Sequence, residues 1–174
     1  MMNQALFDAA PDFGQPIAVL KHCHERIRKQ LVTLQKIPDY LQQHGADEKA
    51  KQAATSVLRY FQQAAPHHHA DEEQDLFPML IATAKDEDAE VLRKLGPEIL
   101  RKHQQMDQLW QKLAAQLNMV ESGSINHLSD ADITHFSQLY SEHMLKEETW
   151  IAPMAKRIFN ADQMAQLGAA MQRR

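Results

Sequence analysis

The sequence has a single cysteine and no long apolar run, and each shortage excludes a class of protein. Cys23, the one cysteine, cannot form an internal disulfide, which fits a reducing compartment. No run of about 18 consecutive apolar residues occurs, so no membrane-spanning helix is predicted. Residues 1–15 also lack the basic stretch followed by an apolar stretch that marks a secretory leader. We therefore expect a soluble, cytoplasmic protein that does not bind a membrane.

An excess of positive charge is missing as well. The 174 residues include 19 Lys and Arg against 23 Asp and Glu, for a formal net charge of −4. Proteins that bind nucleic acid or anionic lipid usually present a basic surface. Neither a nucleic acid nor a membrane is therefore expected as a partner.

Glycine and aromatic residues are also scarce, and this shortage favours helices over a sheet. The chain has five glycines and 6% aromatic residues, and it is rich in Ala, Leu, Gln, Lys and Glu, which are good helix formers. A chain of this length suits one domain and can bury a core without disulfides or other cross-links. We predict an all-α protein with a single domain over residues 1–174.

Apolar residues at alternating spacings of three and four predict four main helices. The expected boundaries are a start near Pro16, turns at His44-Gly45 and at 86–88, and a loop at 122–124. Pro38 and Gly96-Pro97 are expected to kink or break their helices, and Pro66 to bend its own. The prediction is an up-down-up-down antiparallel four-helix bundle over about residues 15–160, with a short appended C-terminal helix over 161–174.

The chain contains ten histidines, and two of them belong to a repeated motif. In one copy His68 is followed four residues later by Glu72, and in the other His143 is followed four residues later by Glu147. In both copies a proline comes ten residues after the histidine. Side chains four residues apart share one face of a helix, about one turn apart. Because both copies interrupt an apolar stripe, the spacing indicates metal ligands in preference to solvated surface residues.

The positions of the histidines relative to the predicted turns place them at one level of the bundle. His24 and His68 lie 21 and 23 residues from Gly45, on its two sides. His103 and His143 each lie 20 residues from the glycine of the 122–124 loop. Positions equidistant from a turn face each other in antiparallel helices. One layer of the core is therefore expected to contain the metal-ligand candidates His24, His68, Glu72, His103, His143 and Glu147.

Four imidazoles and two carboxylates without a thiolate suit iron, manganese, zinc or nickel, and disfavour Fe–S clusters, copper(I), calcium and magnesium. Two buried carboxylates without partners would each cost on the order of several kcal/mol, so they require cations or protons. Glu72 and Glu147 are placed to bridge two metals, with two histidines for each. Open coordination positions could then bind O₂, NO or peroxide. A single metal held by two histidines and one carboxylate is the alternative.

These motifs resemble the hemerythrin-like family, also called the HHE cation-binding domain. The resemblance covers roughly residues 15–160 and rests on His24, His103 and the segments HHADEEQDLFP and HMLKEETWIAP. Ferritin-like carboxylate proteins use Glu-x-x-His instead. The resemblance implies a four-helix bundle around a non-haem di-iron centre with two bridging carboxylates and an oxo or hydroxo bridge, for which zinc or manganese could substitute. It also implies oxygen binding, O₂ or redox sensing, iron handling or repair of iron–sulfur centres.

The chain departs from the oxygen-carrying hemerythrins at two points. Those proteins have a second histidine four residues after the first in the third helix, where this chain has Asp107, and they separate the last histidine from its carboxylate by five residues instead of four. The missing histidine puts simple reversible O₂ carriage in doubt. The pattern is similar to bacterial four-histidine members, including di-iron proteins linked to nitrosative stress and iron-centre repair. Those repair proteins usually carry an N-terminal cysteine-bearing domain, and no cysteine precedes Pro16.

Several neighbouring residues are open to two interpretations. A histidine run is commonly one ligand with solvated neighbours, but His69 and Glu73 form a second pair four residues apart. Asp107 is either an acceptor for a ligating imidazole or a surface charge. Glu73 and Glu148 are expected to be exposed and to take no part in the site.

The predicted function is that of a non-haem di-iron protein that binds or reacts with O₂, NO or peroxide, in sensing or in an oxidative or nitrosative stress response. Iron storage or delivery, or repair of iron–sulfur centres, is the alternative. A sensor would show no turnover and would need a protein partner, which the sequence does not identify. An enzyme would turn over its small ligand, and a storage protein would exchange metal readily. Whether the protein is an enzyme is left open.

Overall fold

The computed structural model describes residues 11–125 and 127–174, and within these ranges every regular element is a helix. The expectation about a leader in residues 1–15 falls mostly outside this description. Among the described helices, none combines the length and the apolarity needed to cross a membrane. The helical elements in chain order are α1 (Pro16–His44), α2 (Glu48–Arg59), η1 (Tyr60–Ala64), α3 (Ala65–Asp71), η2 (Glu72–Leu76), α4 (Phe77–Thr83), α5 (Asp86–Glu121), α6 (Asp130–Lys146), η3 (Glu147–Ile151), α7 (Ala152–Ile158) and α8 (Ala161–Gln172).

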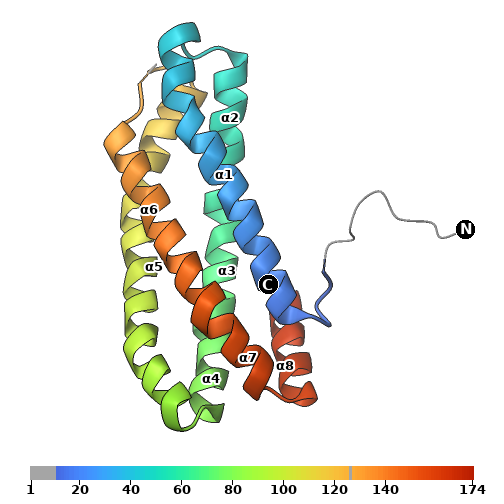
Figure 1. Cartoon of the computed structure of the whole chain (residues 1–174). Coiled ribbons are helices and arrows are strands. Elements are labelled where there is room, and N and C mark those ends of the chain that lie inside the picture. The colour runs from blue at the N-terminus through green and yellow to red at the C-terminus, as the bar shows by residue number, and fades with distance from the viewer. Residues whose placement is uncertain (1–10, 126) are drawn as a thin grey trace, which may run out of the picture.

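These elements form four long helical stretches that run up and down the molecule (Figure 1). The stretches are α1, then α2 through α4, then α5, then α6 through α7. Helix α1 packs against α2 and α6, and α5 packs against the same two helices, which closes the bundle. Helix α8 lies at one end and packs against α1. The predicted four-helix bundle with an appended C-terminal helix is confirmed.

Local sequence signals explain where the stretches begin and end. The side chain of Asp47 accepts a hydrogen bond from the backbone N–H of Ala50, and Ser129 caps α6 in the same way. Asn160 and Gln163 form a reciprocal capping box at the start of α8. Gly45 ends α1 with a φ of 69°, a conformation that favours glycine.

Pro38 and Pro97 do not break their helices, so of the two expected effects, a kink or a break, the break is excluded. Helix α1 continues through Pro38 and α5 through Pro97. Each proline removes one backbone hydrogen bond, which is a local loss. Buried residues beyond each proline, Leu41 and Ile99, keep the chain on its helical path because they pack into the core.

Three other prolines each follow a π-helical turn. The residues just before them, Ala65, Phe77 and Ala152, donate their backbone N–H groups to the carbonyls five residues earlier. Such wide turns insert one extra residue into a helix and occur frequently at functional sites. Two of the three turns begin at Glu72 and Glu147, the glutamates of the repeated motif.

The π-turn at η3 changes which side chain faces the core. A regular helix leaves Trp150 and Ile151 as alternative inward positions after Glu147. The inserted residue resolves this, because Ile151 is 1% exposed whereas Trp150 is 53% exposed. Trp150 therefore does not pack inside the bundle.

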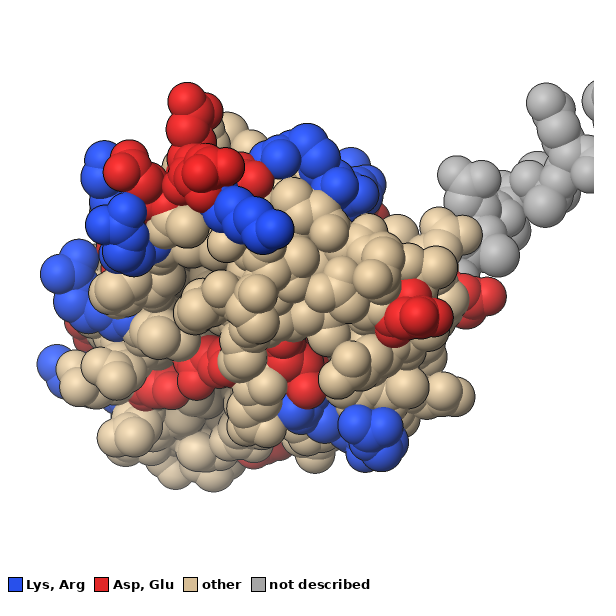
Figure 2. All heavy atoms as spheres, turned by 90° about the horizontal axis from the view of Figure 1, so that it is seen from below, with Lys and Arg blue, Asp and Glu red and all other residues tan. Residues whose placement is uncertain are grey.

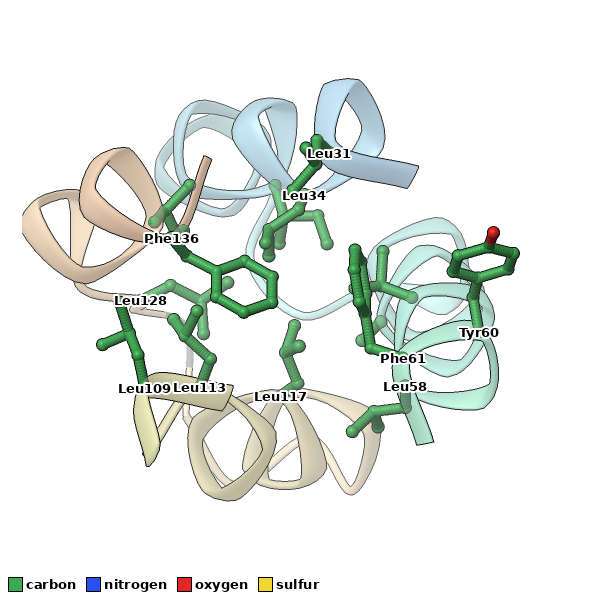
Figure 3. Close-up of a cluster of buried hydrophobic side chains, with 14 of the residues drawn as sticks. Leu31, Leu34, Leu58, Tyr60, Phe61, Leu109, Leu113, Leu117, Leu128 and Phe136 are labelled. Carbon is green, nitrogen blue, oxygen red and sulfur yellow. The ribbon is translucent and has the colours of Figure 1, made fainter. Parts of the chain in front are cut away.

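The apolar core consists of two clusters. One lies around Phe61, Leu113 and Phe136, where Figure 3 shows side chains from α1, η1, α5 and α6 pointing toward one another. The other lies near α8 and includes Leu80 and Ile99. In all four helical stretches, the metal-ligand candidates occupy the boundary between the two clusters, with His24 on α1, His103 on α5 and the two copies of the repeated motif on the other two stretches. A polar layer therefore divides the core.

The surface at the end of the bundle where α8 lies carries charges of both signs. Figure 2 views this end, where acidic and basic side chains lie next to each other around a largely uncharged centre. Asp88 of α5 and Arg157 of α7 form an ion pair with an N–O distance of 2.7 Å. On the described residues of this face, no broad basic patch is visible.

The register set by η3 can be tested with two single substitutions. Ile151→Ala should lower the free energy of unfolding by about 2–5 kcal/mol, because it leaves a cavity in the core. Trp150→Ala should change it by no more than about 0.5 kcal/mol, since exposed substitutions have small effects. Chemical denaturation of the metal-free proteins measures both values. Equal destabilisation by the two substitutions would show that the assigned register is incorrect.

Candidate metal centre

The polar layer brings all six predicted ligand candidates together. Helices α1, α3, α5 and α6 each contribute one imidazole, and the π-turns η2 and η3 each contribute one carboxylate. None of these six side chains belongs to a residue that is more than 4% exposed. These six candidates are His24, His68, Glu72, His103, His143 and Glu147.

The carboxylate of Glu72 lies between two pairs of imidazoles. Its Oε1 atom is 3.0 Å from Nε2 of His68 and 3.9 Å from Nε2 of His24. Its Oε2 atom is 3.3 Å from Nε2 of His103 and 4.0 Å from Nε2 of His143. Each oxygen therefore faces one pair of histidines, which is the arrangement of a carboxylate that can bridge two cations.

Glu147, from the second copy of the motif, lies close to one imidazole of each pair. Its Oε2 atom is 3.2 Å from Nε2 of His24 and 3.1 Å from Nε2 of His143. The Nε2 atoms of His103 and His143 are themselves only 3.2 Å apart. The ring nitrogens and carboxylate oxygens thus converge on a small common volume.

Several of these converging atoms are buried and have no hydrogen-bond partner among the described residues. They include Nε2 of His24, Nε2 of His68, Oε2 of Glu72 and both oxygens of Glu147. A buried polar atom without a partner costs about 1–3 kcal/mol, and more if it is charged. One explanation accounts for all of them, namely that these atoms are placed to share cations.

The donor atoms form two overlapping sets of four. One set comprises His24, His68 and the two glutamates, and the other comprises His103, His143 and the same two glutamates. Within each set the donor atoms lie within 4.8 Å of one another. Imidazole and carboxylate donors suit iron, manganese or zinc. The residues present therefore fit a centre with two metal positions and two shared carboxylates.

The electrostatics of the site also favour positive charge. Burial alone lowers the pKa of His24, but the facing carboxylates of Glu147 and Glu72 raise it to about 10. Burial likewise lowers the pKa of His103, and Glu72 raises it to about 9. Burial raises the pKa of Glu72, yet the surrounding imidazoles, His68 foremost, hold it well below its usual range. The buried carboxylates are therefore anionic and need neighbouring cations.

A second layer of carboxylates holds two of the histidines, and sequence reasoning missed it. Nδ1 of His103 lies 2.6 Å from Oε1 of Glu73, and Nδ1 of His24 lies 2.9 Å from Oε1 of Glu148. Arg28 also donates to both oxygens of Glu148. The expectation that these glutamates take no part in the site is wrong. The side chains of Glu73 and Glu148 are 40% and 28% exposed, yet one carboxylate oxygen of each reaches a buried ring.

The signal for this second layer was the doubled glutamate in each motif. In both copies the first glutamate faces the metal-ligand candidates, and the second reaches the ligand-candidate histidine of a neighbouring helix, His103 for Glu73 and His24 for Glu148. A metal-bound imidazole commonly donates its other N–H to such a carboxylate, which orients the ring. Asp107, the acceptor considered from the sequence, is exposed, and no hydrogen bond joins it to an imidazole among the described residues.

Comparison with known proteins agrees with this geometry. A family model for the hemerythrin HHE cation-binding domain matches residues 15–155. An uncharacterized protein of Haemophilus influenzae is 30% identical over 162 residues, which cover 93% of this chain and 91% of the relative. The chain belongs to the hemerythrin HHE cation-binding domain family, as its motifs predicted.

The assignment of His24 to the site gives a matched test within one helix. His24→Ala should weaken binding of one metal at least about a hundredfold, because even a residue that only orients a ligand contributes 10–100-fold. His22→Ala should bind metal like the wild type, since His22 lies outside the cluster of donors. Anaerobic titration with Fe(II) measures both affinities. A comparable loss in the two variants would rule out the assigned face of α1.

The second-layer glutamates give a further prediction. Glu73→Ala and Glu148→Ala should each weaken metal binding by about 10–100-fold, because the ring of His103 or His24 loses its acceptor. Glutamine at either position should have a smaller effect, since its amide oxygen still accepts the hydrogen bond. Asp107→Ala serves as the exposed control. Metal affinities of both glutamate variants within a factor of two of this control, a margin of roughly 0.4 kcal/mol by the usual conversion, would exclude the role.

Proposed function

We propose that this member of the hemerythrin HHE family holds two non-haem iron ions and uses them to bind or react with a small ligand, O₂, NO or peroxide. His24 and His68 would hold one ion, His103 and His143 the other, and the two shared glutamates would bridge them. The observation that carries this proposal is the convergence of six buried donor groups, many without hydrogen-bond partners, at one level of the bundle. Bound iron would supply redox chemistry and open coordination positions for the small ligand.

The residues around the site support a resident cofactor. Their side chains come from four helical stretches that pack against apolar clusters on both sides. The second-layer carboxylates fix two of the rings. Such preorganisation favours tight and lasting metal binding. Iron storage or delivery requires ready metal exchange, and the near-complete burial of the donors argues against it.

A cavity of about 400 Å³ connects the site with the surface between α1 and α7. Glu72, Glu147 and His24 are buried residues of its lining, and Lys21 and Lys156 lie among its exposed residues. Its walls are otherwise mainly apolar, with Ile17, Leu20, Leu76 and Ile151. A small neutral molecule can reach the carboxylates through this cavity without losing hydrogen bonds on the way. This route supports a ligand of the size and polarity of O₂ or NO.

The hollow of about 460 Å³ between α1 and α2 is not a competing route. It is lined by polar and basic residues such as Arg26 and Arg59, and none of the six ligand candidates contributes to its wall. The cavity near α7 therefore provides the access on which the proposal relies.

The proposal predicts two irons per chain and a change in optical spectrum with a small ligand. Protein loaded anaerobically with Fe(II) should contain two irons, and exposure to O₂ or NO should produce charge-transfer absorption. Glu72→Ala and Glu147→Ala should lose this absorption along with metal, because each removes the shared carboxylate. Elemental analysis and stopped-flow spectroscopy provide the two measurements.

Two results would contradict the proposed function. One is a fully loaded protein with a single iron per chain. The other is a two-iron protein whose spectrum is unchanged by O₂, NO and peroxide, because its metals would then be closed to small ligands. Zinc retained from purification does not decide the question, since affinity order alone can fill such a site with zinc.

A further inference from the structure

His69 is a fifth imidazole of the polar layer, beyond the four assigned to metals above. It is only 6% exposed, and its buried Nε2 atom has no hydrogen-bond partner within residues 11–125 and 127–174. A histidine run suggests that the residues beside the ligand are solvated. His67 is exposed as this predicts, whereas His69 is buried. A buried ring nitrogen without a partner calls for an explanation.

The ring nitrogens of His69, His103 and His143 form a third group of donor atoms. Atoms offered by these three residues lie within 4.8 Å of one another. No described carboxylate lies within ion-pair distance of His69, in contrast to the other imidazoles of the layer. Its nitrogen is therefore not occupied by an acidic partner.

Packing holds the ring of His69 in this place. It stacks on the ring of His103 with a centroid distance of 4.0 Å and an interplanar angle of 11°. Its other neighbour is the buried ring of Tyr140, 5.8 Å away at 23°. A ring nitrogen of His69 already lies near those of His103 and His143, and because the two stacked rings are nearly parallel, one ring must turn about its Cβ–Cγ bond before both in-plane lone pairs can meet at one metal.

The helix geometry explains how neighbouring residues can serve different metals. Consecutive residues on a helix point about 100° apart. His68 faces the pair formed with His24, and His69 faces His103 and His143, while Glu72 lies between the two groups. One turn of helix α3 can thus contribute to both metal positions.

We infer that His69 is the third imidazole ligand of the second metal position, together with His103 and His143. This inference rests on the proposed two-metal function. The first position would have two imidazoles and the second three, so the two metals would be inequivalent. His69 and Asp107 line the same small cavity beside Tyr140. The second metal would accordingly receive its third imidazole from α3. Asp107, which stands where the oxygen-carrying hemerythrins have a histidine, would then not leave the second metal one imidazole short.

The test compares His69→Ala and His69→Gln with the adjacent control His67→Ala. The protein is titrated anaerobically with Fe(II), and each fully loaded sample, prepared with ⁵⁷Fe, is studied by Mössbauer spectroscopy. The wild type and the control should bind two irons and show two distinct quadrupole doublets of equal area. Both His69 variants should bind the second iron at least about tenfold more weakly. In His69→Gln only one of the two doublets should change.

The possible outcomes separate this inference from the proposed function. If both His69 variants match the control in affinity and in both doublets, the inference is overturned and the two-iron function stands. If the wild type binds fewer than two irons, the proposed function fails and the inference fails with it. Helix content measured by circular dichroism shows whether a variant is folded. Loss of both irons from a folded His69→Gln protein would also contradict a role confined to the second position.

Discussion

The structure depends on the burial of two carboxylates inside an apolar core. Glu72 and Glu147 are 1% and 4% exposed, between two clusters of hydrophobic side chains. Such groups are stable only beside positive charge, and the cost of leaving them unpaired would be on the order of several kcal/mol each. The four helical stretches supply imidazoles at this level, and the chain belongs to a family of cation-binding domains. Metal ions would meet the requirement for positive charge with the donors already in place.

The two copies of the motif build the two halves of the site in the same way. In each copy a histidine and a glutamate face the centre, the next glutamate reaches a histidine on another helix, and a π-turn ends before a proline. Small differences break this symmetry. Arg28 neutralises Glu148, whereas no ion-paired lysine or arginine is found for Glu73 among the described residues. Unequal surroundings of this kind would give two bound metals different affinities and redox properties.

The bundle and its polar layer could be predicted from the sequence because both depend on periodicity. Apolar spacing placed the helices, and distances from the turns placed His24 and His103 at the level of the motifs. The π-turns could not be predicted, since an inserted residue leaves no mark on a simple 3.6-residue pattern, and that pattern alone does not decide whether Trp150 or Ile151 faces the core. The contact of Glu73 with His103 depends on how helices pack against each other, which spacing along one helix does not reveal.

The most direct test of the central claim is a crystal of the iron-loaded protein measured at the iron absorption edge. The account predicts two anomalous peaks within about 4 Å of each other, as in other two-metal sites. Both peaks should lie between the carboxylates of Glu72 and Glu147, one near His24 and His68 and the other near His103 and His143. A single peak at full occupancy, or peaks outside this layer, would contradict the account.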